Sequence, residues 1–238
     1  MTEAARAPTT LAGPWRTATV GDVAHPSPYG VRLRLAVPER VAHVPGQHYV
    51  VRLTAPDGYV AQRSYSAASD PADPELELYV ERLADGEVSP YLVDEVRVGD
   101  RLEVRGPIGG WFVWDGVAPM LGIGGGSGVV PLVAMLRHAA RLGRGHLVSL
   151  AAGASTFSRL PYGEELLAAG ALVALSQEEQ PQRPKGRLRA DELAPLLAGR
   201  ERYFVCGSAG FAEALSTALV ALGVDAAQIR IERFGPSG

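Results

Sequence analysis

The hydrophobic rhythm of the chain changes once, close to Trp114–Val117. Residues 14–114 break into short segments in which apolar and polar residues alternate, as in Val31-Arg32-Leu33-Arg34-Leu35. Residues 115–238 instead alternate buried-strand patterns with helical patterns. Because side chains repeat every 2 residues in a strand and every 3.6 in a helix, the two rhythms predict two architectures. We expect two domains, 14–114 and 115–238, preceded by a flexible tail over residues 1–13.

The first half is predicted to form a six-stranded antiparallel β-barrel. Turn signals such as Pro45-Gly46 and Asp85-Gly86 separate its segments, and closure of the sheet removes exposed edges. The segment Ser89–Glu95 is expected to be helical, with Ser89 as its cap and Pro90 in its first turn. The alternation in Val31–Leu35 and in Leu76-Glu77-Leu78-Tyr79-Val80 indicates half-buried strands. The expected strands are Arg16–Val23, Gly30–Val37, Gln47–Thr54, Gln62–Ala67, Glu75–Arg82 and Arg101–Arg105.

The second half is predicted to form an α/β doubly wound parallel sheet with helices on both faces, because strand and helix patterns alternate regularly. A Glu- and Pro-rich stretch, Gln177–Lys185, is expected to be a surface loop. The expected strands are Val117–Ile123, His146–Ala151, Ala171–Ser176, Tyr203–Cys206 and Gln228–Glu232. The expected helices are Gly128–Leu142, Tyr162–Ala169, Ala190–Leu197 and Ala209–Leu222.

Composition excludes several classes of site. A single cysteine, Cys206, excludes an internal disulfide and a cysteine-ligated zinc or iron–sulfur site within these residues. The five histidines lack metal-ligand spacing, so no metal site is expected. The formal net charge of -3 gives no reason to expect nucleic acid as a partner. With no apolar run near the roughly 20 residues of a membrane helix and no secretory signal, we expect a cytoplasmic protein without a membrane partner.

A glycine cluster, Gly122–Gly128, follows an expected strand and opens an expected helix. Backbone N–H groups in such a turn converge on an anion at the helix N-terminus. Ser127 stands where a strict G-x-G-x-x-G that starts at Gly122 would need its last glycine, and no acidic residue ends the next strand. The cluster therefore indicates either a phosphate-binding turn or a tight turn without a ligand, and does not by itself identify a dehydrogenase.

The segment Arg63-Ser64-Tyr65-Ser66 combines a basic, an aromatic and two hydroxyl side chains on one expected strand. Arginine can bind a pyrophosphate in a bidentate way, a tyrosine can pack on a planar ring, and a serine can hydrogen-bond a ring nitrogen. An edge strand without a ligand would account for these residues as well. Similarly, Gly86-Glu87-Val88-Ser89 offers a second helix N-terminus for phosphate, or is a plain turn and cap.

Together these segments resemble the ferredoxin–NADP reductase superfamily over residues 14–235. The segment Arg63–Ser66 matches its R-x-Y-S flavin motif, and Gly86–Ser89 matches its G-x-x-S pyrophosphate loop. The turn Gly124-Gly125-Gly126-Ser127-Gly128 is similar to its nicotinamide-nucleotide turn. The pair Cys206-Gly207 matches a C-G pair after a late strand, and Glu232-Arg233-Phe234 resembles its terminal acid-x-aromatic segment. The motifs also follow the family's order.

The resemblance implies a barrel that binds FAD. Arg63 would bind the FAD pyrophosphate, helped by the backbone amides of Val88 and Ser89. Tyr65 would lie along the isoalloxazine ring, and Ser66 would hydrogen-bond near flavin N5. Ser64 and Gly86 are expected in the cofactor site as the remaining named positions of the same two motifs.

The resemblance also implies a nicotinamide site in the second domain, formed by Gly124, Gly125, Gly126, Ser127, Gly128 and Gly207. Cys206 and Glu232 would lie where nicotinamide enters, and Phe234 near the flavin's outer face or the nicotinamide. Ser66, Cys206 and Glu232 are thus the groups expected near hydride transfer. We expect no catalytic thiolate, and a small buried residue at a strand end is the alternative for Cys206.

The choice of nucleotide depends on the segment after the second strand of the nucleotide domain. Family members that use NADH often carry an arginine there, and Ser155 stands in its place. Hydroxyl groups together with Arg159 could bind a 2′-phosphate, which favours NADPH over NADH, although Arg159 could equally be solvated.

The resulting prediction is an FAD-dependent NAD(P)H oxidoreductase, in which hydride passes from nicotinamide to flavin N5. Single electrons would then pass to a separate acceptor, either a ferredoxin or an oxygenase component, because the single cysteine rules out a plant-type iron–sulfur domain within this chain. Two alternatives are a free-flavin reductase and a non-catalytic flavin-binding electron-transfer subunit. The sequence does not specify the oligomeric state.

Overall fold

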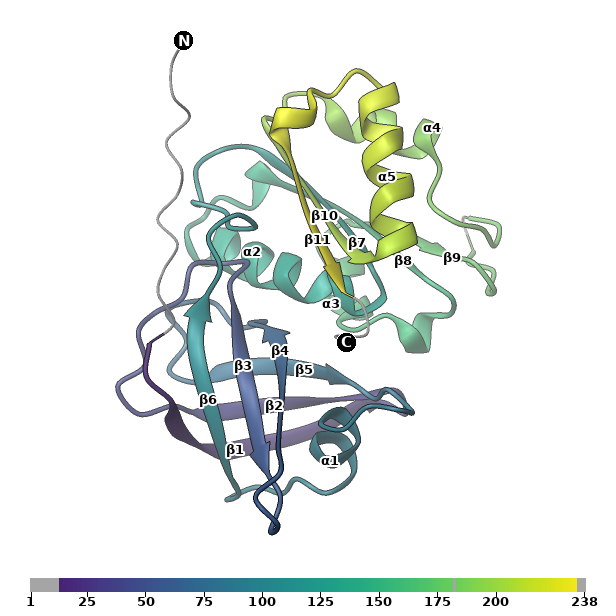
Figure 1. Cartoon of the computed structure of the whole chain (residues 1–238). Coiled ribbons are helices and arrows are strands. Elements are labelled where there is room, and N and C mark those ends of the chain that lie inside the picture. The colour runs from purple at the N-terminus through teal and green to yellow at the C-terminus, as the bar shows by residue number, and fades with distance from the viewer. Residues whose placement is uncertain (1–12, 182, 235–238) are drawn as a thin grey trace.

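Two β-sheets, one from each half of the chain, lie next to each other in the computed structural model (Figure 1), which describes residues 13–181 and 183–234. All but one residue of the expected tail, 1–13, lie outside the described residues. The first sheet consists of β1 (Arg16–Ser27), β2 (Gly30–Ala36), β3 (His48–Thr54), β4 (Val60–Ser66), β5 (Leu76–Glu81) and β6 (Arg101–Ile108), and the helix α1 (Ser89–Asp94) follows β5.

The first sheet has the strand order β4-β3-β6-β1-β2-β5, with antiparallel pairing throughout. Its two edge strands approach each other where Ala67 forms an isolated bridge with Leu78. A single apolar core fills the interior, with Val31, Leu33 and Val51 fully buried in it. The prediction of a six-stranded antiparallel domain is confirmed.

Strand β5 differs from the expectation of a half-buried strand. Five consecutive residues, Leu76–Val80, are all buried. The alternation of Leu76-Glu77-Leu78-Tyr79-Val80 does place the leucines in the barrel core. The other face of β5 is covered by the second domain, so Glu77 and Tyr79 are buried as well. The sequence pattern could not reveal this second cover, because it comes from residues far along the chain.

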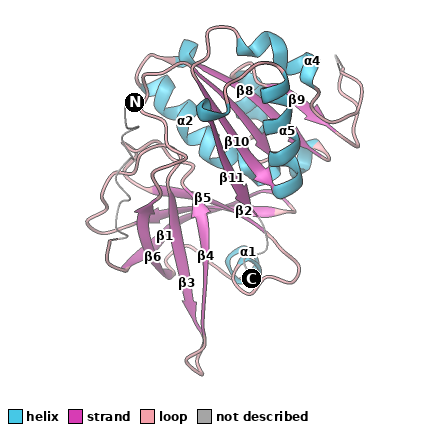
Figure 2. Cartoon of the chain, turned by 45° about the horizontal axis from the view of Figure 1, so that its top comes forward, coloured by secondary structure: helices cyan, strands magenta, loops and turns pink. Residues whose placement is uncertain are grey.

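The second sheet is parallel, in the strand order β11-β10-β7-β8-β9. Helices α2 and α3 pack on one face, and α4 and α5 pack on the other (Figure 2). The prediction of a doubly wound domain is therefore confirmed. Its elements are β7 (Met120–Gly125), α2 (Val130–Arg141), β8 (Val148–Ala154), α3 (Gly163–Ala168), β9 (Leu172–Leu175), α4 (Ala190–Leu193), β10 (Arg202–Ser208), α5 (Ala209–Ala221) and β11 (Ile229–Phe234).

Short 3-10 turns account for several differences from the expected boundaries. The helix expected over 128–142 begins as a 3-10 turn, Gly126–Val129, and continues as α2, with Pro131 in its first turn. The helix expected over 190–197 is α4 followed by a 3-10 turn that contains Pro195. Proline cannot donate a backbone hydrogen bond, which favours such breaks at helix starts. The strand expected from His146 begins at Val148, after a further 3-10 turn.

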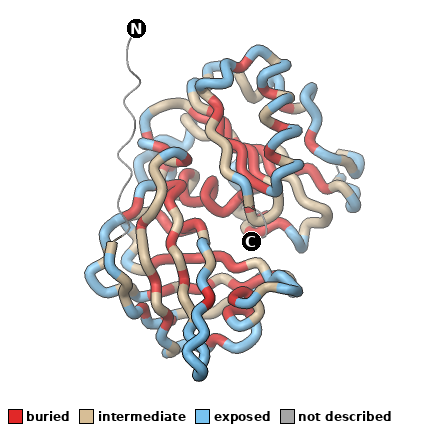
Figure 3. Tube along the Cα trace, viewed as in Figure 1, coloured by how far each residue is buried: buried red, intermediate tan, exposed pale blue. Residues whose placement is uncertain are grey.

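In the second half, buried residues gather in the strands of the parallel sheet and in helix α2 (Figure 3). Trp114, in the connection between the two sheets, is buried, and its backbone N–H donates to Pro45 O at 3.1 Å. Its indole Nε1 donates to Ala118 O at 2.8 Å. The connection is therefore attached to both halves of the molecule. Among the described residues, no helix is long and apolar enough to cross a membrane.

Candidate functional site: a cavity between the two sheets

A cavity of about 830 Å³ opens between the two sheets. The barrel contributes the end of β4 and the segment that connects β5 to α1. The second domain contributes Gly125 at the end of β7, Ser208 at the end of β10 and Glu232–Phe234 at the end of β11. These are carboxyl ends of parallel strands, beside the point where the strand order reverses between β7 and β10. Ligands of doubly wound sheets bind at this position.

Three residues that line this cavity each carry a buried polar atom without a hydrogen-bond partner among the described residues. These atoms are Oη of Tyr65 and Oγ of Ser66, from β4, and Oε2 of Glu232, from β11. Buried side-chain oxygens are nearly always hydrogen-bonded, since an unmet one costs about 1–3 kcal/mol. Three such residues around one cavity indicate a ligand that carries polar atoms. A flavin ring has this character.

All four residues of Arg63-Ser64-Tyr65-Ser66 line the cavity, although alternate side chains of the strand point to opposite faces. β4 is an edge strand, so the cavity reaches both of its faces. Burial raises the pKa of Tyr65 well above its usual range, with the Arg63 charge acting in the opposite direction. The Tyr65 phenol therefore keeps its proton and remains a hydrogen-bond donor.

Burial also raises the pKa of Glu232, to about 7. Its carboxyl group can therefore hold a proton near neutral pH, unlike an exposed glutamate. A carboxylic acid in this state can donate a hydrogen bond into the cavity, whereas the carboxylate can only accept one.

Arg63 lines the cavity, and its side chain is partly exposed. Its guanidinium contacts the Glu87 carboxylate at 3.3 Å and donates to Gln62 O at 2.7 Å. The same carboxylate accepts from Tyr59 Oη at 2.7 Å. Pairs as exposed as Arg63–Glu87 contribute only about 0–1 kcal/mol. A pyrophosphate can therefore replace Glu87 as the partner of the Arg63 guanidinium. In this respect the site fits FAD.

The Gly86–Ser89 segment also lines the cavity through Gly86, Val88 and Ser89, but the expected cap by Ser89 is wrong. The N-cap residue of α1 is Val88, without a side-chain cap. Ser89 Oγ instead accepts from Leu83 N at 3.1 Å, which stabilises the preceding loop. The first amides of α1 therefore have no side-chain acceptor, as a site for a phosphate oxygen requires.

Close packing explains the glycines of the turn after β7. A side chain at Gly128 would place its Cβ 2.3 Å from the carbonyl oxygen of Cys206, and one at Gly124 would lie 2.7 Å from Val129. Gly126 has a φ of 54°, a conformation that favours glycine. From the expected nucleotide residues of this turn, Gly125 and Ser127 line the cavity. The Ser127 hydroxyl donates to Glu81 Oε2 at 2.7 Å.

Cys206 lies next to the cavity-lining Glu232 in the sheet but is not itself part of the lining. It is fully buried in β10 and pairs with Glu232 of β11 in the parallel register. Burial, together with the nearby Glu232 charge, raises the pKa of its thiol well above the usual range. These properties match a packed core residue. At Gly207, a Cβ would lie 2.8 Å from the ring of Phe211.

The segment expected to select the nucleotide lies outside the cavity lining. The backbone O of Ser155 accepts from Gln177 N at 2.8 Å, and the Arg159 guanidinium stacks 3.8 Å over the ring of Tyr29, in the barrel. Glu178 accepts a 2.8 Å hydrogen bond from Phe157 N. Sequence reasoning missed this carboxylate, whose negative charge beside the segment would disfavour a 2′-phosphate.

Several residues of the cavity wall were not expected from the sequence. His48 comes from β3, where it pairs with Ser66, and burial lowers its pKa. Tyr79 and Glu81 come from the end of β5, and Ser208 ends β10. The sequence feature that could have identified these residues is their position at or next to the ends of predicted strands. The described residues contain no cluster of His, Cys, Asp and Glu that could hold a metal ion.

Comparison with known proteins agrees with this geometry. The family described as "oxidoreductase FAD-binding domain" matches residues 24–113. The reductase component of the naphthalene 1,2-dioxygenase/salicylate 5-hydroxylase systems of Ralstonia sp. is 31% identical over 87% of this chain and 65% of its own length. These similarities support the resemblance to the ferredoxin–NADP reductase superfamily.

Two further similar proteins extend the comparison. The ferredoxin reductase component of 3-ketosteroid-9-alpha-monooxygenase from Mycobacterium tuberculosis is 33% identical over 83% of this chain and 56% of its own. The FAD/NAD-binding domain of a Vibrio cholerae nitric oxide dioxygenase superposes with a TM-score of 0.84, at 26% identity, over 93% of this chain and 99% of its own. The chain thus spans 56–65% of the length of these two reductase components.

Proposed function

We propose that the chain is an FAD-dependent NAD(P)H oxidoreductase that delivers electrons to a separate redox protein. The observation that carries the proposal is the set of three unpartnered buried oxygens, on Tyr65, Ser66 and Glu232, around one cavity between a barrel and a doubly wound sheet. When bound there, FAD would accept a hydride from the nicotinamide at N5 and release the electrons one at a time.

The barrel residues would bind and orient the cofactor. Arg63 would exchange Glu87 for the pyrophosphate, and the uncapped amides at Val88 and Ser89 would bind a second phosphate oxygen. Tyr65 would pack along the ring system, and Ser66 would donate a hydrogen bond to the ring edge. The role of Ser66 uses its unpartnered Oγ.

The second domain would bring the nicotinamide to the same cavity. The turn that contains Gly125 and Ser127 opens a helix whose first amides can bind a phosphate. Glu232 and Phe234, at the end of β11, would lie beside the nicotinamide, with Glu232 holding or releasing a proton near neutral pH. Cys206 would support this wall from the neighbouring strand. Both NADPH and NADH are candidate donors. Ser155, in place of the arginine of NADH-using relatives, favours NADPH, whereas the negative charge of Glu178 favours NADH.

The acceptor is proposed from the named relatives, which are reductase components of oxygenase systems. A ferredoxin or an oxygenase component would therefore receive the electrons. We place the protein in the cytoplasm, where NAD(P)H is available.

Rapid mixing of the FAD-loaded protein with NADH and with NADPH, without oxygen, tests the proposal. Loss of the oxidised flavin absorbance within seconds with at least one nucleotide is the expected result. No bleaching with either nucleotide would overturn it and would favour a non-catalytic electron-transfer subunit. Flavin that separates from the protein on gel filtration, combined with reduction of added flavin, would instead identify a free-flavin reductase.

A further inference from the structure

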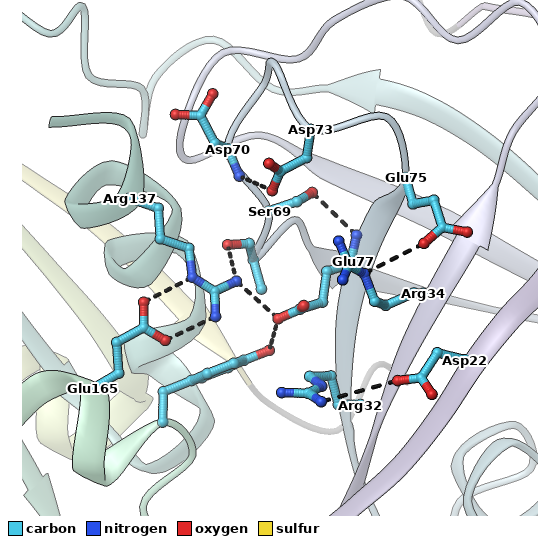
Figure 4. Close-up of polar contacts among 12 residues, drawn as sticks. Asp22, Arg32, Arg34, Ser69, Asp70, Asp73, Glu75, Glu77, Arg137 and Glu165 are labelled. Carbon is cyan, nitrogen blue, oxygen red and sulfur yellow. Dashed lines mark hydrogen bonds and ion pairs between the residues drawn. The ribbon is translucent and has the colours of Figure 1, made fainter. Parts of the chain in front are cut away.

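The barrel and the second domain contact each other through α2, whose Arg137 side chain reaches across the boundary (Figure 4). Nη1 of Arg137 donates to Oε1 of Glu77 at 2.8 Å and to the backbone oxygen of Ala68 at 3.0 Å. Nε and Nη2 donate to the two oxygens of Glu165, each at 2.8 Å. One guanidinium thus joins β5 of the barrel to α2 and α3 of the second domain.

The Arg137 contacts are largely removed from water. The Glu77 side chain is 7% exposed and that of Arg137 is 23% exposed. Tyr162 donates to the same Glu77 oxygen at 2.9 Å, and the Arg137 guanidinium lies 5.0 Å from its ring centroid. A charge that is buried this far depends on its partner, because removing one member leaves the other without solvent or counter-charge.

A second contact lies one helical turn further along α2. Arg141 donates to the carboxylate oxygens of Asp70 at 2.8 and 3.0 Å, and the Asp70 side chain is 6% exposed. Residues four apart lie on the same face of a helix, so Arg137 and Arg141 attach one face of α2 to the barrel at two successive points.

The N-terminal end of the same helix follows directly on the glycine turn that borders the cavity. Gly126–Val129 leads into α2, and Arg137 follows Gly128 by nine residues, which corresponds to about 13 Å of helix. A helix transmits displacement along its axis as a nearly rigid rod. The contacts of Arg137 with the barrel, together with the hydrogen bond from Ser127 to Glu81, therefore help to set where the glycine turn lies.

We propose that Arg137 is a positioning residue for hydride transfer, which it controls by fixing the glycine turn of the second domain over the flavin-binding face of the barrel. The inference rests on the function proposed above. Arg137 acts at a distance: neither it nor Glu77 lines the cavity. Substitution of Arg137 should therefore slow the reduction of flavin by the nucleotide. It should leave unchanged the reduction of flavin by a small reductant, which does not need the second domain to position a nucleotide.

The chain contains a matched control for a purely structural role. Arg183 forms a bidentate pair with Glu192 at 2.8 and 2.9 Å, and their side chains are 10% and 14% exposed. Both residues lie in the second domain, so this pair does not cross the boundary. Loss of stability alone should affect an Arg183 variant and an Arg137 variant in the same way.

The test compares the FAD-loaded full chain with the variants Arg137→Gln, Tyr162→Phe and Arg183→Gln. Flavin bleaching by saturating nucleotide is measured in stopped flow, and reduction by dithionite is measured in parallel. We expect Arg137→Gln to bleach about 10- to 100-fold more slowly with the nucleotide, because small misplacements reduce rates by such factors. Its dithionite rate should be unchanged. Tyr162→Phe should show a smaller decrease, and Arg183→Gln should match the wild type.

Each other outcome is also decisive. A nucleotide rate in Arg137→Gln within twofold of wild type would overturn the inference, as would an equal slowing in Arg183→Gln. If Arg137→Gln does not fold or retain FAD, Tyr162→Phe decides, and a wild-type rate in that variant overturns the inference. If the wild type itself is not bleached by either nucleotide, the proposed function fails first and the inference falls with it.

Discussion

The Ser127 hydroxyl donates a 2.7 Å hydrogen bond to the Glu81 carboxylate, which joins the glycine turn to the end of β5 across the cavity. A carboxylate at the first turn of a helix uses the same donors and the same positive end of the dipole as a phosphate would. Binding of a dinucleotide phosphate and the Glu81 contact should therefore compete for Ser127.

Glu81→Gln should tighten the binding of oxidised nucleotide by about fivefold. The substitution removes one negative charge beside the incoming phosphate, and such a repulsion is worth about 1 kcal/mol at 4 Å in water. Titration of the FAD-loaded protein with NAD+ and NADP+, followed by the flavin spectrum, measures the change. Glu201→Gln, before β10 and so at the opposite end of the sheet, is the control. Unchanged or weaker binding in Glu81→Gln would refute the competition.

Arg63→Ala should weaken FAD binding by about 10- to 100-fold. Hydrogen bonds to charged groups are worth about 1.5–3 kcal/mol, and the variant loses the proposed hydrogen bonds between the guanidinium and the pyrophosphate. The dissociation constant is measured by fluorescence titration of the flavin-free protein. Arg101→Ala, an exposed arginine at the start of β6, should bind FAD normally. FAD retention equal to wild type after dialysis would contradict the role given to Arg63.

The raised pKa of Glu232, about 7, predicts a specific dependence of stability on pH. The folded state holds a proton that the unfolded state releases near pH 4.5, so this group stabilises the fold below pH 4.5. That contribution is lost as the pH rises to 7. Between pH 5 and pH 8 the free energy of unfolding should decrease by about 2 kcal/mol more in the wild type than in Glu232→Gln.

Urea unfolding of both flavin-free proteins at the two pH values measures this difference. Contributions of all other titrating groups cancel in the comparison. Parallel pH profiles for wild type and Glu232→Gln would show that the carboxyl titrates normally.

Glu178→Gln should shift the nucleotide preference toward NADPH. The Glu178 carboxylate accepts from Phe157 N beside Ser155, where its charge would repel a 2′-phosphate. The ratio of bleaching rates with NADPH and NADH, both below saturation, should rise about fivefold. The neighbouring exposed Glu179→Gln serves as control. An unchanged ratio would show that Glu178 does not face the 2′ position.

Local patterns were sufficient to predict both folds. Alternation in Val31–Leu35 depends on residues that are neighbours in sequence, as does the strand–glycine–helix order at Gly122–Gly128. Proline and glycine set the turns through their own backbone preferences. For that reason the strands and helices were placed within a few residues. Arg63–Ser66 could likewise be recognised from side-chain types alone, and its four residues do line the cavity.

Tertiary structure decided which residues complete the site. Glu81 meets Ser127 across 46 residues of chain, and Arg137 meets Glu77 across 60. Burial by the second domain gives Glu77 its ion pair, and burial in the cavity wall raises the pKa of Glu232. The sequence determined the elements and the flavin motif, because these follow from short-range periodicity and side-chain chemistry. Packing of distant segments decided which side chains pair with each other and how far burial shifts their pKa values. Both depend on contacts and desolvation that exist only in the folded protein.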